Sequence, residues 1–277
     1  MQTQLDKPIR KVIHYEGAEQ KYFIRLPKGF DPNKTYWPLV AAHGGGGDGL
    51  TFWMCDRLQS IAEEQSLKAI VISPSFDKSD APAEAHPLLG GISFLNHVLQ
   101  DVHQNYNLHP RILLTGYSRG GQFAHRYALY NPDSVEACAP FSPGSWTTPD
   151  GRLIISPLGE IKDPKSFLTS PQNATNVTKS VQYIFDPRIA NIVGTLAKPD
   201  AKRIPFLIMC GSLDERFESA QKFADNLKST GYHVETEWPT TAHGGRQDEA
   251  SRSEFDKYPR SAIRFFLKIT NKNRAHG

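Results

Sequence analysis

The sequence predicts an α/β protein with a mostly parallel central sheet of about eight strands and helices on both faces of that sheet. Two observations lead to this prediction. Short apolar runs alternate along the chain with longer stretches of helical periodicity, and four consecutive runs are apolar on both faces. Strands of that kind belong in a sheet that helices cover on both sides. The alternation favours parallel neighbours joined by right-handed crossovers.

The expected strands are short apolar runs. They occupy residues 21–26, 37–43, 68–74, 111–116, 135–141, 205–211 and 233–238. A further run at 11–16 precedes the first of them at hairpin distance, so these two are expected to add antiparallel strands at one edge of the sheet.

The expected helices carry apolar residues at steps of three and four positions. Their apolar faces span residues 95–106, 123–128, 217–227 and 262–267. Asn131-Pro132 ends the second of these helices, and Gly231 follows the third as a stop signal.

Residues 142–203 interrupt this alternation. They separate the sixth strand from the seventh by far more chain than one crossover helix needs, and they are rich in Pro, Ser, Thr and Asn. We expect an irregular lid or substrate-binding insertion over the C-terminal edge of the sheet, within a single domain that spans residues 1–277. One or two short helices are expected at 181–196.

The segment Gly116-Tyr117-Ser118-Arg119-Gly120 matches the G-x-S-x-G pattern of a nucleophile elbow. It stands between an expected strand and an expected helix, which is the setting that the motif requires. Small residues on each side of the serine let the strand and the helix approach without a Cβ clash. Ser118 is therefore the expected nucleophile, and an ordinary Gly-Ser turn is the alternative.

A glycine-rich run begins at His43, at the end of the expected strand 37–43. Such a run can turn backbone N–H groups towards the oxyanion of an ester-hydrolysis intermediate. We expect the oxyanion hole to use the amide of Arg119 and that of Gly45, with Gly44 as the alternative donor. A phosphate-binding loop is the competing interpretation, but the run lacks both glycine-motif spacings known for phosphate. His43 is expected to shape the loop by hydrogen bonding.

A serine nucleophile needs a base, and the base needs an orienting acid. The order expected after this elbow is an acid and then a histidine. His243 lies in a loop just past the last expected strand, where its side chain can reach over the sheet edge. The other downstream histidines are His125, His233 and His276. Asp214 follows the strand 205–211 and is the expected acid, with Glu215 as the alternative.

These motifs resemble those of the α/β-hydrolase superfamily, and more narrowly those of small serine esterases in the feruloyl esterase and poly(3-hydroxybutyrate) depolymerase-like group. The resemblance covers residues 20–141 and 204–269, and it is carried by Y-F-I-R-L-P, H-G-G-G-G-D-G, G-Y-S-R-G-G, G-S-L-D and A-H-G-G. It implies an α/β-hydrolase fold with a lid-like insertion between the sixth and seventh strands.

The expected function is that of a serine carboxylic-ester hydrolase. Ser118 attacks the acyl carbon, His243 accepts the serine proton and Asp214 holds the imidazole, so that an acyl-enzyme forms and is hydrolysed. No metal or organic cofactor is expected. Two alternatives remain: a small peptidase or amidase of the prolyl-oligopeptidase type, which shares the triad, and a catalytically silent binding module on the same fold.

The expected substrate is a small-molecule or polymeric ester, whose acyl and alcohol groups the sequence leaves open. Gly44, Tyr117 and Trp146 are the candidate substrate-binding residues. Other aromatic or apolar side chains could line a pocket at the sheet edge, and packing within the insertion is the competing interpretation for them. They are Phe52, Trp53, Phe167, Tyr183, Phe185 and Ile189.

Composition excludes several other classes of protein. The net charge of +3 gives no argument for nucleic-acid binding. No apolar run approaches the ~20 residues that span a bilayer, and the N-terminus lacks the apolar segment of a signal peptide. The chain as written is expected to be cytoplasmic, with a secreted mature form as the alternative. Cys55, Cys138 and Cys210 form no C-x-x-C pair, and one disulfide among them stays open. No pattern indicates an oligomeric state.

Overall fold

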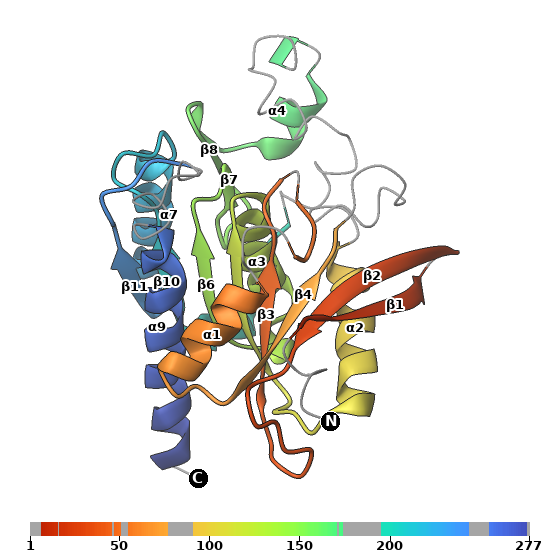
Figure 1. Ribbon diagram of the computed structural model, residues 1–277. Coiled ribbons are helices and arrows are strands. Elements are labelled where there is room, and N and C mark those ends of the chain that lie inside the picture. Colours follow the sequence, from red (N-terminus) through yellow and green to blue (C-terminus); the bar gives the residue numbers. More distant parts are fainter. Residues whose placement is uncertain are drawn as a thin grey trace.

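The computed structural model describes residues 7–15, 17–45, 47–50, 55–76, 91–170, 172–173, 195–243 and 255–275. Across these residues runs one large sheet of eight strands, and a second sheet of three short strands lies beside it (Figure 1).

The large sheet is mostly parallel. Its strands are β1 (Ile9–Tyr15), β2 (Ala18–Arg25), β3 (Trp37–Ala42), β4 (Ala69–Pro74), β5 (Ile112–Tyr117), β6 (Val135–Phe141), β10 (Phe206–Met209) and β11 (Val234–Glu237). They lie in the order β1-β2-β4-β3-β5-β6-β10-β11. The pairs β1–β2 and β2–β4 are antiparallel, and the other neighbours are parallel. Both the predicted parallel sheet and its antiparallel edge are confirmed.

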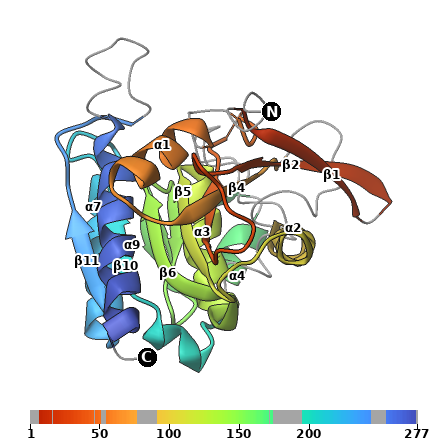
Figure 2. The same cartoon turned by 60° about the horizontal axis from the view of Figure 1, so that its bottom comes forward.

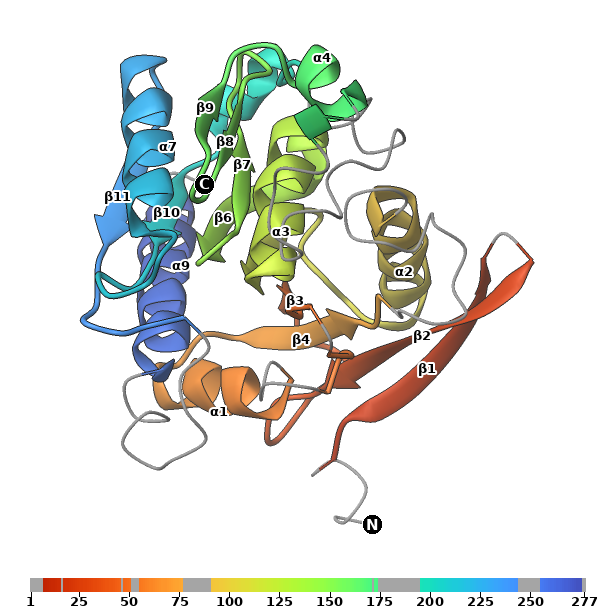
Figure 3. The ribbon, with the colours of Figure 1, turned by 90° about the horizontal axis from the view of Figure 1, so that it is seen from above.

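Helices cover both faces of this sheet. On one face lie α1 (Asp56–Glu64) and α9 (Lys257–Ala275), and on the other lie α2 (Gly91–Asn105), α3 (Arg119–Tyr130) and α7 (Phe217–Ser229) (Figures 2 and 3). Successive side chains of a strand point to opposite faces, so Leu39 packs towards α1 and α9 while Val40 packs towards α2 and α3. None of the helices in the described ranges combines the length and apolar character needed to cross a bilayer.

The insertion between β6 and β10, the sixth and seventh strands of the large sheet, is more regular than expected. Its described part contains an antiparallel sheet of β7 (Ser145–Thr147), β8 (Leu153–Ile155) and β9 (Gly159–Ile161), then α4 (Pro164–Thr169). Strands of three residues are too short for periodicity to reveal, and this corrects the prediction of an irregular segment. The small sheet lies beside α3 and α7 (Figure 3). The helices expected at 181–196 lie almost entirely outside the described residues.

Within the described ranges, two short 3-10 helices join the main elements, η3 (Pro132–Ser134) before β6 and η5 (Pro199–Arg203) before β10. The three cysteines are free and buried, so none forms a disulfide. Burial raises the pKa of the Cys55 and Cys210 thiols to about 12, which makes both thiols unreactive at neutral pH.

Candidate active site

Ser118 occupies the tight turn between β5 and α3. Its backbone has φ 54° and ψ −113°, which is a strained conformation for a residue with a side chain. A β-carbon on Gly116 would lie 2.3 Å from the carbonyl oxygen of Gly120, and one on Gly120 would lie 1.9 Å from that of Ala42. The turn therefore closes only with glycine on both sides of the serine, which is the physical content of the G-x-S-x-G pattern.

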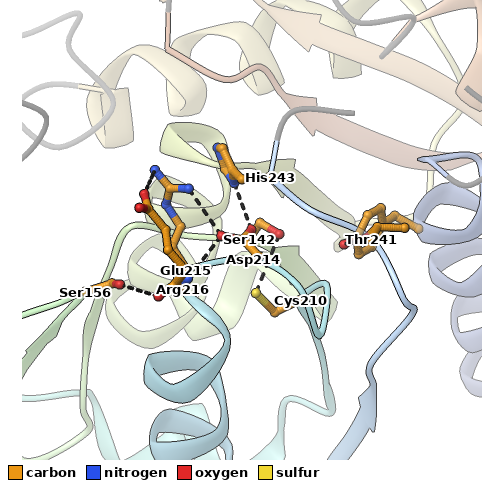
Figure 4. A network of polar contacts seen from close by, with 9 residues as sticks. Ser142, Ser156, Cys210, Asp214, Glu215, Arg216, Thr241 and His243 are labelled. Atoms are coloured by element: carbon orange, nitrogen blue, oxygen red, sulfur yellow. Dashed lines mark hydrogen bonds and ion pairs between the residues drawn. The ribbon is translucent and has the colours of Figure 1, made fainter. Parts of the chain in front are cut away.

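The expected acid and base are in direct contact. His243 Nδ1 and Asp214 Oδ2 lie 2.9 Å apart (Figure 4). The Asp214 side chain is fully buried, whereas that of His243 is 24% exposed. An imidazole whose Nδ1–H donates to a carboxylate has its Nε2 lone pair available to accept a proton. The alternative acid, Glu215, is exposed and its carboxylate pairs with Arg216.

Backbone hydrogen bonds join the loop of the acid to the loop of the base. The N–H of Leu213 donates to the carbonyl of Thr241 at 3.1 Å, and that of Ser212 donates to Pro239 at 2.8 Å. The hydroxyl of Thr241 is also 2.6 Å from that of Tyr258 on α9. The loops after β10 and β11 therefore form one structural unit, although they are far apart in the sequence.

Tyr117 places the histidine next to the elbow. Its ring stacks on the ring of His243, with centroids 5.1 Å apart and planes at 22°. On other sides it packs against Phe141 and Phe255. Tyr117 directly precedes Ser118, so the imidazole stacks on a residue of the elbow itself. Tyr117 is itself buried, and its expected contact with substrate stays a prediction.

His43 shapes the glycine-rich run as expected. Its Nδ1–H donates to the carbonyl of Gly44 at 2.8 Å, and its Nε2 accepts the backbone N–H of Phe76 at 2.9 Å. Because Nε2 accepts from a backbone amide, the proton of the neutral ring resides on Nδ1. Both ring nitrogens are thus engaged within the protein, which leaves His43 no site for proton transfer to a substrate.

The glycine-rich run passes close to the residues on each side of Ser118. A β-carbon on Gly44 would lie 3.0 Å from the ring of Tyr117, and one on Gly45 would lie 3.2 Å from Nε of Arg119. This proximity is compatible with an oxyanion hole formed by the amides of Gly45 and Arg119, which stays a prediction. Gly46 lies outside the described residues.

Two opposing effects act on the pKa of Asp214. Burial alone would raise it, but the hydrogen bond and charge of His243, together with the backbone N–H and the charge of Arg216, outweigh burial and hold the pKa below its ordinary value. The carboxylate is therefore ionised at neutral pH. Arg216 was missed in the sequence, where its only signal is its position two residues after the acid.

Trp146 packs in the interior and corrects a second prediction. Its side chain is fully buried and stacks on Phe223 of α7, with centroids 4.4 Å apart and planes at 19°. It also packs against the ring of His125, with the two ring centroids 5.0 Å apart. A side chain enclosed in this way holds the small sheet against α7 and does not reach a substrate. Phe167 is partly buried on α4. The other aromatic and apolar candidates lie outside the described residues: Phe52, Trp53, Tyr183, Phe185 and Ile189.

Comparison with known proteins gives one family and many similar folds. The family model described as alpha/beta hydrolase fold matches residues 38–274. A search of curated protein sequences gave no match.

Similar solved structures include the S-formylglutathione hydrolase FrmB from Staphylococcus aureus, with 18% identity, a TM-score of 0.61, and coverage of 94% of this chain and 98% of that one. A ferulic acid esterase has 16% identity, a TM-score of 0.64, and coverage of 93% and 98%. Est1E from Butyrivibrio proteoclasticus has 15% identity, a TM-score of 0.62, and coverage of 95% and 99%. At these identities the likeness is one of fold.

Proposed function

The chain belongs to the alpha/beta-hydrolase family, and from that premise we propose that it is a serine carboxylic-ester hydrolase that works through an acyl-enzyme intermediate. Ser118 is the nucleophile, His243 the base and Asp214 the acid that orients the base. The observation that carries the proposal is the Asp214–His243 hydrogen bond of 2.9 Å. The imidazole of this pair stacks on Tyr117, the residue before Ser118.

The proposed reaction has two halves. In the first, Ser118 Oγ attacks the acyl carbon while His243 Nε2 takes the hydroxyl proton, and the amides of Gly45 and Arg119 donate to the oxyanion. The C–O bond to the alcohol then breaks, and His243 returns the proton to the departing oxygen. In the second half, His243 removes a proton from water, which attacks the acyl-enzyme and releases the carboxylic acid and Ser118.

The strained backbone of Ser118 supports this role. A serine with φ 54° is costly to the fold, and such strain is concentrated at functional sites. The names of two structural neighbours support an ester substrate, because one is described as an S-formylglutathione hydrolase and another as a ferulic acid esterase. A small-molecule or polymeric ester is accordingly the proposed substrate class.

Labelling with a fluorophosphonate, which reacts with activated serines, tests the proposal. The protein should be labelled at Ser118, and Ser118→Ala should abolish labelling and reduce ester hydrolysis to about 10³ to 10⁴ times the uncatalysed rate. Ser66→Ala is a matched control, because Ser66 shares the left-handed backbone with φ 64° but lies in the turn after α1. Normal turnover by folded Ser118→Ala would exclude the proposed mechanism.

A substrate panel separates ester hydrolysis from the alternative peptidase activity. p-Nitrophenyl esters of increasing chain length, methyl ferulate and a polyester film should be compared with aminoacyl p-nitroanilides under the same conditions. The proposal expects hydrolysis of esters, with p-nitroanilides slower by orders of magnitude. A preference for the p-nitroanilides would assign the same triad to a peptidase.

A further inference from the structure

The carboxylate of Asp214 has a different partner on each oxygen. Oδ2 accepts from His243 Nδ1 at 2.9 Å. Oδ1 accepts from the backbone N–H of Arg216 at 3.0 Å and from Nη1 of the same residue at 3.3 Å (Figure 4). Asp214 has no exposed side-chain surface and that of Arg216 is only 16% exposed, so water screens this contact weakly. A guanidinium therefore acts on the oxygen that does not face the imidazole.

The same guanidinium also pairs with an exposed carboxylate. Its Nη2 lies 3.4 Å from Oε1 of Glu215, whose side chain is 74% exposed. The carbonyl of Glu215 accepts from the hydroxyl of Ser156, just after β8, at 2.6 Å. Arg216 is thus fixed in a chain of contacts that runs from the small sheet of the insertion to the buried acid.

Resting on the proposed function, we propose that Arg216 is a positioning residue that orients Asp214 and shares its negative charge, and so weakens the attraction between Asp214 and an imidazolium at His243. The physical reason is electrostatic. A carboxylate stabilises the imidazolium form of its partner, and a cation on the far oxygen opposes that stabilisation. The acid limb of the activity profile, where activity falls with decreasing pH, should therefore lie at lower pH with Arg216 in place than without it.

Two other titratable side chains of the described residues act together with Asp214, and both stay neutral in the working pH range. Cys210 lies at the end of β10 and Tyr258 on α9, and burial raises the pKa of each to about 12. Tyr117, beneath the imidazole, contributes its ring face. Among the described groups that act on Asp214, Arg216 is therefore the cation whose removal should strengthen the attraction of Asp214 for an imidazolium at position 243.

The test is the pH dependence of Ser118 labelling by a fluorophosphonate, repeated as kcat/KM on a neutral p-nitrophenyl ester. Arg216→Met removes the charge but keeps the backbone N–H contact to Asp214. We expect the acid limb of the Arg216→Met pH profile to move to higher pH by about half to one unit. Well below the midpoint, labelling and kcat/KM should then be roughly three- to tenfold lower than in wild type. Arg216→Lys retains the charge and should keep the limb near the wild-type position.

Two further variants make the sign of the effect decisive. Glu215→Gln removes an anion that partly neutralises Arg216, so its acid limb should move slightly in the opposite direction, to lower pH. Lys222→Met on α7 removes a cation that pairs with Glu218 and should leave the limb unmoved.

The inference is overturned if Arg216→Met leaves the acid limb in place, or if Arg216→Lys shifts it as far as Arg216→Met does. If Arg216→Met does not fold, a limb that moves to higher pH in Glu215→Gln would also overturn it. Failure of the proposed function is a distinct outcome, because wild-type protein would then show no labelling at Ser118 at any pH.

Discussion

Gly211 and Thr241 approach each other too closely for any side chain to fit between them. A β-carbon on Gly211 would lie 2.0 Å from the carbonyl oxygen of Thr241 and 2.5 Å from its hydroxyl oxygen. Gly211 comes three residues before Asp214, and Thr241 two residues before His243. This contact therefore sets the separation of the two loops that bring the acid to the base.

Gly211→Ala should consequently impair activity more than stability. The added methyl group meets backbone atoms that cannot rotate away, so the two loops must separate. A displacement of about 1 Å at a catalytic contact can reduce turnover about 100-fold, and we expect a loss of that order in kcat on a p-nitrophenyl ester. Thermal unfolding of the same sample reports whether the fold persists.

Gly231→Ala is the matched control. Gly231 has φ 87°, and a β-carbon there would meet nothing within 4 Å. The substitution should lower the free energy of unfolding by about 1 kcal/mol through backbone strain alone and leave kcat unchanged. Wild-type kcat in folded Gly211→Ala would show that the Gly211–Thr241 contact does not determine the geometry of the active site.

Asp214→Asn tests the orienting role of the acid with almost no change in shape. The amide can present an N–H to His243, which favours the wrong imidazole tautomer, and we expect kcat to fall by about 10³ to 10⁴. Asp225→Asn, on the exposed side of α7, is the control and should keep wild-type kcat. Equal kcat values for Asp214→Asn and Asp225→Asn would show that Asp214 is not the acid of the triad.

The charge of Asp214 also contributes to stability, and the sign follows from its pKa. That pKa is lower in the folded protein than its ordinary value of 3.8, so the contribution is complete above about pH 4 and is lost as pH falls through the folded pKa. The free energy of unfolding of wild type should therefore exceed that of Asp214→Asn at neutral pH, and the difference should shrink in strongly acidic solution.

Much of the fold could be predicted because its signals are local. The strand expected at 37–43 spans Trp37–Ala42, and the one expected at 135–141 matches Val135–Phe141. Both are buried along their whole length, so hydrophobicity alone reveals them. The pairing of Asp214 with His243 was also predictable, because the ends of parallel strands meet at one edge of the sheet and few residues of the right type follow them.

The unpredicted features depend on contacts between segments far apart in the sequence. Trp146 suggested a pocket because aromatic residues often line pockets, but its environment is set by Phe223, on a helix far along the chain. The strands of the insertion are too short to show periodicity. Arg216 is a charged residue just before α7, and nothing in its local pattern distinguishes a surface cation from one that binds a buried carboxylate.

Trp146→Phe and Trp146→Ala test whether this residue has a packing role. The indole nitrogen has no hydrogen-bond partner among the described residues, so Trp146→Phe loses contact area but also removes an unsatisfied donor. We expect Trp146→Phe to lower the melting temperature modestly and Trp146→Ala to cost about 3 to 5 kcal/mol of unfolding free energy. KM should be unchanged in the phenylalanine variant. An increased KM with unaltered stability would instead support the prediction that Trp146 contacts the substrate.

His125 should make stability depend on pH in mildly acidic solution. It is fully buried on α3, where Nδ1–H donates to the carbonyl of Gly121 at 3.0 Å and Nε2 accepts the N–H of Thr147 at 3.0 Å. Burial, and then the charge of Arg126, hold its pKa well below the ordinary 6.5. A second proton would place N–H against N–H at Thr147, and would break the link between α3 and β7.

The sign of this dependence follows from proton uptake. Below pH 6.5 this histidine is protonated in the unfolded chain but not in the folded protein. The unfolded state therefore binds more protons, and the free energy of unfolding decreases as the pH is lowered. The slope is about 1.4 kcal/mol per pH unit for one proton. Urea unfolding between about pH 7.5 and 5 should show this slope in wild type and a flatter one in His125→Gln, which is less stable at pH 7.5. His14→Gln, on the exposed side of β1, should retain the wild-type slope. Parallel curves for wild type and His125→Gln would mean that the buried imidazole does not govern this acid sensitivity.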